Sequence, residues 1–318
     1  MKKALSVVIV LMIIFTCIIG CCEDPIKVIA MKGPTGMGVV WLDDEKYEDV
    51  ISLEYVASAE EAKVEFVSGN ADVVCLPTNM AAALYAKLPE DNVRLLALNT
   101  LGVLYIVENG DTVHSLQDLE GKTLYVTGQG STPEYVIRWI LEKNNLSDKV
   151  DLEFVDDHDT LATMAAAGMV KLAMLPEPKV TTALMNSADL HVALDVTELY
   201  NETAEAEGTD AVLSMGCLLT KQNVIEEHTD EIVTFMEAYR NSVERANESI
   251  DESAERMAEK GIIPKAPVAV NAIPRCHMVF ITGEEMKKQI APFFEMLYQS
   301  DPKSTGGSLP GDDLYYIP

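Results

Sequence analysis

The chain has 318 residues, roughly twice the size of a common domain, so we expect two packed units. Its 48% hydrophobic and 24% charged residues are an ordinary globular mixture, which excludes a disordered or collagen-like chain. The 51 Asp and Glu residues outnumber the 24 Lys and Arg residues, and the formal net charge of −27 repels phosphate backbones. We therefore expect no nucleic-acid partner.

The N-terminus has the pattern of a secretory signal peptide. Lys2 and Lys3 precede the uncharged apolar run Ala4–Ile19. The run leads into Ile18-Ile19-Gly20-Cys21, which resembles the lipobox of bacterial lipoproteins, where the cysteine is lipidated after cleavage. We expect residues 1–20 to be removed and Cys21 to hold the protein on the outer face of the cytoplasmic membrane or in the periplasm. The alternative, a transmembrane anchor of roughly 16 residues, is short for a bilayer.

Cysteine usage agrees with export. Beyond the anchor region, the chain has Cys75, Cys217 and Cys276. We expect a disulfide between Cys217 and Cys276, and a buried thiol at Cys75, which lies in an apolar strand. The chain has no CxxC motif, so we expect no redox centre and no metal site.

Short apolar runs alternate with helical patterns, which predicts an α/β fold with parallel sheets. The expected strands are Lys27–Met31, Ser52–Ala57, Ala71–Leu76, Arg94–Leu98, Thr123–Val126, Asp151–Phe154, Lys171–Leu175 and His191–Asp195. The expected helices include Asn79–Lys87, Pro133–Lys143 and Leu161–Ala166. Val224–Lys260 has apolar residues near a 3.6-residue spacing and predicts helices on an outer face.

A weak internal repeat divides the chain into two similar parts. Ser68–Pro77 and Ala167–Pro176 both contain a glycine, a spacer, a buried strand and Leu-Pro, and a helix begins soon after each. The strand-to-glycine turn at Met31–Gly38 corresponds in the same way to the turn at Val126–Pro133. Two matched pairs in the same order predict two similar lobes.

Two long apolar runs without turn signals, Leu101–Glu108 and Ala211–Thr220, are expected to cross between the lobes as a hinge. The predicted divisions are a tether at residues 21–26, a first lobe at 27–100 plus 221–318, and a second lobe at 101–220 that includes the crossing strands.

Four strand-to-helix turns have a composition suited to ligand binding. They are Lys32–Gly38, Pro77–Asn79, Gly128–Thr132 and Glu177-Pro178. In parallel α/β lobes, the carboxyl ends of strands and the amino ends of the following helices border one crevice, where free N–H groups favour an anionic or electron-rich group. Helix capping alone would use the same Ser, Thr and Asn residues. The arrangement of the turns as two matched pairs favours a ligand cleft.

Patterns for catalysis are weak. Gly128-Gln129-Gly130 has Pro133 where a dinucleotide fingerprint needs its third glycine, and the chain has neither a P-loop nor a GxSxG motif. The five histidines are scattered, and Asp156–Asp159 is typical of a solvated loop that caps a helix, with cation binding as the alternative. We expect no cofactor and no enzyme activity.

Several of these motifs together resemble one family. The lipobox, the turn Lys32–Gly38, Ala71–Asn79 and Thr127–Tyr135 are similar to the substrate-binding lipoproteins of ABC importers in the nitrate/sulfonate/taurine group, which includes binders of thiamine-pyrimidine precursors. The resemblance covers essentially the whole mature chain. It implies a type II periplasmic-binding-protein fold, with two α/β lobes joined by two crossing strands and a ligand cleft between them. It also implies capture of a solute for a membrane permease, without chemistry on the solute.

The resemblance implies which residues line the cleft. They are Thr35, Gly36, Met37, Thr78, Asn79, Asn99 and Thr100 in the first lobe, and Gln129, Gly130, Ser131, Thr132, Glu177 and Thr181 in the second. Glu177 either accepts hydrogen bonds from an amine or heterocycle, or faces solvent at a helix start. The aromatic residues either stack on a ligand or pack in the core; they are Trp41, Tyr105, Tyr135, Phe280 and Tyr315.

The ligand class stays open between a small organic anion and a small nitrogen heterocycle. Lys32 is the only basic residue in the four turns, so a strong clamp for an inorganic anion is missing from them. Two alternatives to solute capture are an enzyme on the same fold, similar to chorismate dehydratase, and a lipid-anchored sensor with a vestigial cleft. We expect a monomer whose partners are the solute, the membrane anchor and an ABC permease.

Overall fold

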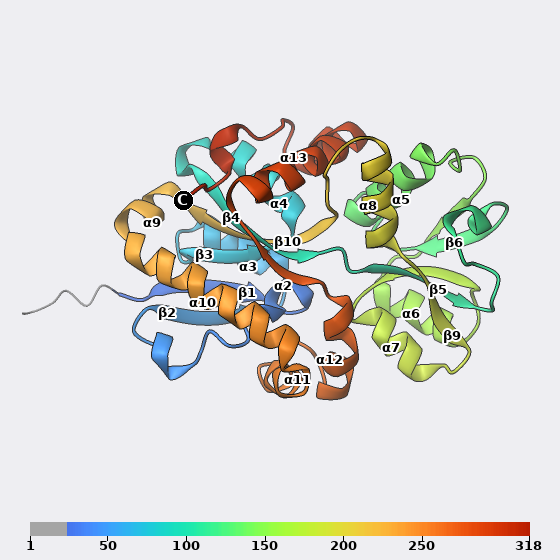
Figure 1. Ribbon diagram of the computed structural model, residues 1–318, viewed down its shortest axis with the longest axis horizontal. Coiled ribbons are helices and arrows are strands. Elements are labelled where there is room, and N and C mark those ends of the chain that lie inside the picture. The colour runs from blue at the N-terminus through green and yellow to red at the C-terminus, as the bar shows by residue number, and fades with distance from the viewer. Residues whose placement is uncertain (1–23) are drawn as a thin grey trace, which may run out of the picture.

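The computed structural model describes residues 24–318. The predicted signal peptide, residues 1–20, and the predicted lipidation site, Cys21, lie outside the described residues. Within them, no helix is both long and apolar enough to cross a membrane. Two mixed α/β sheets, each covered by helices, lie end to end as two lobes (Figure 1).

A six-stranded sheet forms the first lobe, in the order β11-β4-β10-β3-β1-β2. Its strands are β1 (Ile26–Met31), β2 (Ile51–Val56), β3 (Val73–Leu76), β4 (Val93–Leu101), β10 (Ser214–Lys221) and β11 (Met278–Ile281). β10 runs antiparallel to β3 and β4. We predicted most of β10 as a crossing strand of the second lobe, but it pairs within the first sheet. β11 is not among the expected strands, although Met278–Ile281 is a short apolar run that ends shortly before a glycine.

A five-stranded sheet with the same plan forms the second lobe, in the order β7-β6-β8-β5-β9. Its strands are β5 (Leu104–Asn109), β6 (Thr123–Val126), β7 (Asp151–Phe154), β8 (Leu172–Pro176) and β9 (Leu190–Asp195). In each sheet the first parallel strand lies between the second and the third, and one antiparallel strand separates the third from the fourth. This equivalence confirms the two similar lobes that the internal repeat predicts.

Helices cover both sheets, as buried apolar strands require. Those of the first lobe are α2 (Pro34–Met37), α3 (Ala59–Val67), α4 (Thr78–Lys87), α9 (Gln222–Glu227), α10 (Thr229–Glu248), α11 (Ile250–Glu259), α12 (Ala266–Ala272) and α13 (Gly283–Ser300). Those of the second are α5 (Thr132–Lys143), α6 (His158–Ala166), α7 (Lys179–Asn186) and α8 (Val196–Ala206). As predicted, the acidic loop caps a helix: the Asp157 carboxylate accepts from Thr160 N at 2.8 Å.

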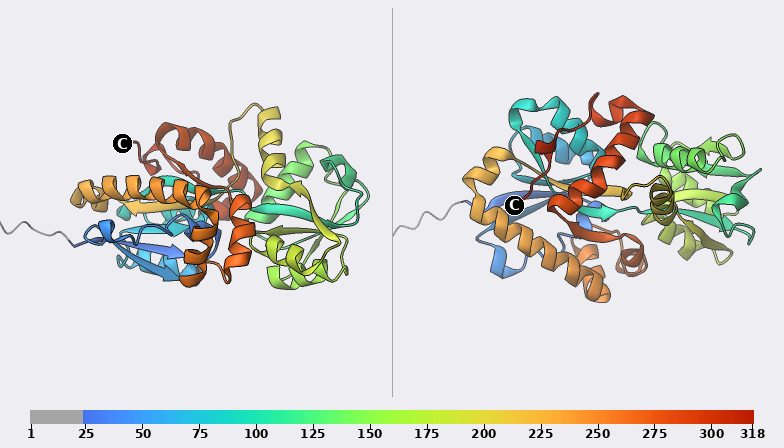
Figure 2. Two further views of the ribbon diagram at one scale, coloured as in Figure 1. Left: turned by 60° about the horizontal axis from the view of Figure 1, so that its bottom comes forward. Right: turned by 45° about the horizontal axis from the view of Figure 1, so that its top comes forward.

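The carboxyl ends of the parallel strands in the two lobes face each other where the chain crosses. β4 ends at Leu101 and β5 begins at Leu104, which lies opposite Pro176 at the carboxyl end of β8. The start of β10, Ser214, lies opposite Leu101. We call these two sets of strand ends, with the turns that follow them, the facing edges. The lobes also touch on either side of this line, α12 against α7 and α13 against α5 (Figure 2).

The predicted disulfide between Cys217 and Cys276 is wrong. In the described part of the chain, Cys75, Cys217 and Cys276 are free, buried thiols. Cys217 packs with Leu76 in the apolar cluster on one face of the first sheet, whereas Cys276 packs with Leu218 in the cluster on the other face. Because successive residues of a strand point to opposite faces, the sheet itself separates the two sulfur atoms.

Candidate functional site

The predicted residues of the first lobe form a hydrogen-bonded row along its facing edge. Thr78 Oγ1 lies 2.8 Å from Ser214 Oγ, which donates to Thr100 O at 3.4 Å. Thr100 Oγ1 donates to Asn99 Oδ1 at 3.0 Å, and Asn99 Nδ2 donates to Thr35 O at 3.0 Å. All five residues are buried. The structure thus brings these four predicted residues together and adds Ser214, which the sequence patterns do not indicate.

Two glycines allow close backbone packing here, Gly36 against the end of β1 and Gly216 against the row itself. A Cβ atom on Gly36 would stand 1.9 Å from Met31 O, and one on Gly216 would stand 2.4 Å from Asn99 Oδ1. Only a residue without a side chain fits at such positions. The predicted turn at Gly36 therefore tightens into the short helix α2, which lies directly after β1.

Three of the residues predicted to line the cleft lie in helices and differ in exposure. Met37 is fully buried and packs with the apolar cluster under the first sheet. Asn79 is half-buried in the first turn of α4, and Thr132 is buried at the first residue of α5. Asn79 is therefore the better placed of the three to meet a solute.

The turn at the facing edge of the second lobe is more open. Ser131 Oγ donates to Gly128 O at 2.6 Å, and Gly130 N donates to Glu134 Oε2 at 2.7 Å. Gln129 and Gly130 are exposed. The Gly130 N–H already has an acceptor, so Gln129 carries the accessible polar side chain of this turn.

A buried carboxylate joins the two lobes. Glu177, only 2% exposed, follows β8; its Oε2 accepts from Thr181 N at 3.1 Å and its Oε1 from Thr181 Oγ1 at 3.0 Å. Arg275, which precedes β11 of the first lobe, donates from Nε to Glu177 Oε1 at 2.5 Å and from Nη2 to Thr181 Oγ1 at 2.6 Å. Of the two alternatives for Glu177, the one in which it faces solvent at a helix start is therefore excluded.

The segment from Arg275 to His277 lies against the crossing strand. Tyr105 OH donates to Arg275 O at 2.9 Å. His277 Nδ1 lies 2.6 Å from Gly102 O, and Leu101 N donates to His277 O at 3.1 Å. Burial, together with two nearby carboxylates, raises the pKa of Tyr105 far above its ordinary value, so its hydroxyl stays protonated as a donor.

Arg275 and His277 are site residues that sequence reasoning missed. The four turns contain Lys32 as their single basic residue, and Lys32 lies exposed beside Gly261. Arg275 reaches the facing edge from a segment 98 residues away from Glu177. No local pattern marks that segment as part of a site, because its approach depends on how α12 packs against α7.

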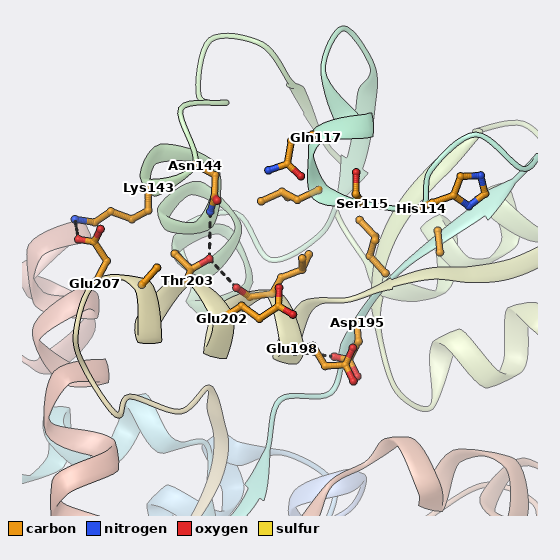
Figure 3. A pocket seen from close by; sticks show the side chains of 15 residues that line it. His114, Ser115, Gln117, Lys143, Asn144, Asp195, Glu198, Glu202, Thr203 and Glu207 are labelled. Atoms are coloured by element: carbon orange, nitrogen blue, oxygen red, sulfur yellow. Dashed lines mark hydrogen bonds and ion pairs between the residues drawn. The ribbon is translucent and has the colours of Figure 1, made fainter.

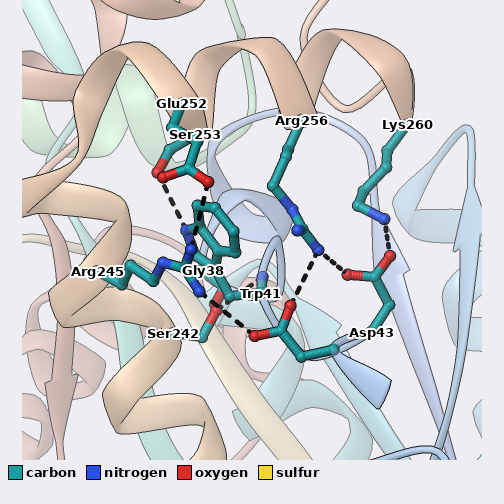
Figure 4. Close-up of polar contacts among 10 residues, drawn as sticks. Gly38, Trp41, Asp43, Ser242, Arg245, Glu252, Ser253, Arg256 and Lys260 are labelled. Atoms are coloured by element: carbon teal, nitrogen blue, oxygen red, sulfur yellow. Dashed lines mark hydrogen bonds and ion pairs between the residues drawn. The ribbon is translucent and has the colours of Figure 1, made fainter.

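Trp41 packs in the interior of the first lobe and is not available to stack on a ligand (Figure 4). Its ring centroid lies 3.3 Å from the Arg245 guanidinium carbon and 4.0 Å from that of Arg256. Its indole N–H donates to Ser253 Oγ at 3.1 Å, and its backbone N–H donates to Ser242 Oγ at 3.1 Å. Trp41 is 3% exposed, so the core-packing interpretation is confirmed for it.

A hollow of about 430 Å³ lies on the second lobe between α5, β9 and α8 (Figure 3). Its polar lining includes four carboxylates: Asp195, Glu198, Glu202 and Glu207. Lys143 pairs with Glu207 at 2.6 Å. None of the predicted binding residues lines this hollow, and all of its lining residues belong to the second lobe.

Comparison with known proteins assigns the family. A family model described as NMT1/THI5 like matches residues 51–253. The chain belongs to the NMT1/THI5-like family. This match, with the structural neighbours described next, confirms the resemblance to the nitrate/sulfonate/taurine substrate-binding group. No curated protein sequence matches the chain.

Solved structures confirm the periplasmic-binding-protein fold. An ABC transporter protein from Parabacteroides distasonis is 24% identical, with a TM-score of 0.77 over 93% of this chain and 99% of that one. The periplasmic aliphatic sulphonate binding protein SsuA from Escherichia coli is 14% identical, with a TM-score of 0.70 over 93% of each chain. The alkanesulfonate-binding protein SsuA from Xanthomonas axonopodis pv. citri, bound to MOPS, is 12% identical, with a TM-score of 0.60 over 91% and 95%.

Proposed function

We propose that this protein captures a small solute between the facing edges of its two lobes and delivers it to an ABC importer in the membrane. The observation that carries this proposal is the meeting of two polar edges from matched lobes: the buried hydroxyl and amide row of the first, and Gln129, Glu177 and Thr181 of the second. Ligands of such α/β lobes bind at the carboxyl ends of the strands. Capture requires no chemical step on the solute.

The solute is a small organic anion of the sulfonate, nitrate or taurine class, or a small nitrogen heterocycle such as an aminopyrimidine. The polar groups at the edges suit either class, because hydroxyls and amides both donate and accept hydrogen bonds. Two of the similar structures are named as sulphonate-binding proteins, which supports the anion class.

We also infer a lipid anchor at Cys21, an extracytoplasmic location and a monomeric state. The lipobox pattern of residues 18–21 supports the anchor, and the formal net charge of −27 disfavours attachment to anionic lipid through basic side chains. Metabolic labelling with a radioactive fatty acid tests the anchor: the wild type is expected to carry label, and Cys21→Ser to carry none.

Thermal unfolding with a ligand panel tests solute capture. The panel holds nitrate, methanesulfonate, ethanesulfonate, taurine, aminopyrimidines, benzoate and chorismate. A ligand present at about a hundred times its Kd stabilises the folded state by about 2.7 kcal/mol, which is a visible shift. We expect one class to raise the melting temperature and to be recovered unchanged.

Variants identify where the solute binds. Asn79→Ala and Gln129→Ala, one on each facing edge, are expected to weaken binding, and Glu202→Gln in the hollow of Figure 3 is expected to leave it unchanged. The reverse pattern would place the site in that hollow. Conversion of chorismate would favour the enzyme alternative, and no shift with any compound would favour a sensor with a vestigial cleft.

A further inference from the structure

Arg275 is held in one orientation before any solute arrives. Its carbonyl oxygen accepts from Tyr105 OH at 2.9 Å, and its guanidinium donates to Glu177 Oε1 at 2.5 Å and to Thr181 Oγ1 at 2.6 Å. A long arginine side chain ordinarily loses rotamer freedom when it binds a ligand. Here that freedom is already lost, so the guanidinium is preorganised.

These bonds use only part of the guanidinium. An arginine has five N–H donors, and here Nε and one N–H of Nη2 are engaged. Among residues 24–318, no further acceptor is bound by the remaining N–H groups of this guanidinium, and the side chain is 29% exposed. The N–H groups of Nη1 and Nη2 match the two oxygens of a carboxylate or sulfonate.

Glu177, unlike Arg275, is fully buried and both of its carboxylate oxygens already accept hydrogen bonds. Its side chain is 0% exposed, and its two oxygens already accept from Thr181 N, Thr181 Oγ1 and Arg275 Nε. A buried carboxylate needs a paired charge, so Glu177 orients Arg275 and does not itself need a ligand. The pair has no net charge. A bound monoanion therefore adds one negative charge at this place and a dianion adds two, in a chain whose formal net charge is already −27.

We propose that Arg275 recognises the charged group of the solute, that Glu177 is its positioning residue, and that the pair selects organic monoanions over neutral molecules and dianions. The headgroup is a carboxylate or a sulfonate. This inference rests on the proposed solute capture and deepens it. It assigns the solute to the organic anions, not to the heterocycles, and it assigns recognition of the anion to Arg275.

Isothermal titration of the full chain, purified in detergent, tests the choice of charge. The probes are ethanesulfonate, propionate, the neutral isostere ethanesulfonamide, and sulfate. We expect the wild type to bind one of the two monoanions about tenfold more tightly than the sulfonamide or sulfate. Arg275→Gln is expected to remove this preference. Arg94→Gln is the matched control, because Arg94 also pairs with a carboxylate, that of Asp313 at 3.7 Å, but near the start of β4, at the end of that strand opposite the facing edge.

Two further variants separate recognition from folding. Arg275→Lys keeps the charge without the paired N–H groups and is expected to keep a reduced preference for the monoanion. Glu177→Gln keeps the side-chain shape and removes the competing charge, so the affinity for sulfate is expected to rise about tenfold. A merely structural contact would weaken all four probes to the same extent and would not raise any of them.

Each outcome decides the proposal. A wild type that binds neither ethanesulfonate nor propionate overturns it, as does an Arg275→Gln protein that keeps the preference for the monoanion. Binding of an aminopyrimidine with the same affinity in wild type and Arg275→Gln overturns it and leaves solute capture standing. Solute capture itself fails only when the whole ligand panel is without effect on the wild type.

Discussion

Gly216 lies directly against Asn99: a methyl group on its Cα would stand 2.4 Å from Asn99 Oδ1. The same methyl group would also stand 2.9 Å from Thr35 Cγ2 and 3.0 Å from Thr100 Cβ. Asn99 cannot swing aside freely, because it donates to Thr35 O and accepts from Thr100 Oγ1. The side chains of the polar row in the first lobe therefore occupy the space that a side chain at position 216 of β10 would need.

Gly216→Ala is therefore expected to disturb both stability and solute binding. Forcing a methyl group into a packed site costs about 1–3 kcal/mol, and the displaced Asn99 and Thr100 would weaken the solute contacts. Urea denaturation and ligand titration measure the two effects. Gly311→Ala is the control, since its methyl group would meet only the ends of two side chains, Asp313 and Tyr85. Equal, small effects of both substitutions would contradict the packing argument.

The Trp41 cluster of Figure 4 predicts a large contribution to the stability of the first lobe. Trp41→Ala is expected to lower the free energy of unfolding by about 3–5 kcal/mol, because it removes a fully packed aromatic ring. Arg256→Met removes one of the two stacked guanidinium groups and is expected to cost about 0.5–2 kcal/mol. Circular dichroism during urea denaturation measures both.

Arg138, an arginine on the surface, serves as the control for the stability effect of Arg256→Met. The guanidinium of Arg138 lies 5.6 Å from the Phe154 ring centroid, and its side chain is 54% exposed. Arg138→Met is expected to change the free energy of unfolding by less than about 0.5 kcal/mol. A cost for Arg256→Met as small as this would show that the stacking on Trp41 adds little.

His158 predicts a dependence of stability on pH. Burial, and then the nearby charge of Lys179, lower the pKa of His158, whose Nδ1 lies 2.5 Å from Thr127 Oγ1. The folded protein therefore binds this proton less readily than the unfolded chain does, so the stability from His158 is complete above about pH 6.5 and declines as the pH falls below it. Urea denaturation between pH 5 and 8 is expected to show a shallower decline in His158→Gln than in the wild type; parallel curves would refute this assignment.

The free thiols predict slow chemical labelling. Cys75, Cys217 and Cys276 are fully buried, and burial raises the pKa of each, to about 12 for Cys75. Since the thiolate is the reactive form, a disulfide reagent is expected to label them only after unfolding in guanidinium. Peptide mapping without reductant is the second measurement, and a peptide pair joined through Cys217 and Cys276 would contradict the structure.

Much of the site follows from local sequence. Thr35 and Thr78 lie in the turns that the local sequence marks after apolar strands, and strand ends of a parallel sheet share one edge. Asn99 and Thr100, which complete the row with them, are expected there only from the family resemblance. Ser214 joins this row from the start of β10. Because β10 is antiparallel to its neighbours, its amino end, and not its carboxyl end, lies at this edge. The sequence offers no signal for it, since a single serine at a strand start is common.

The sequence by itself determined the two α/β lobes, their internal equivalence and the turns that border them, because strand burial, helix capping and turn chemistry act between near neighbours in the chain. Only the tertiary structure decided which distant groups meet. It placed Cys217 and Cys276 on opposite faces of one sheet and brought Arg275 to Glu177 across the line between the lobes. Such contacts depend on how whole helices and sheets pack, and a buried charge such as that of Glu177 acquires its partner only when that packing is complete.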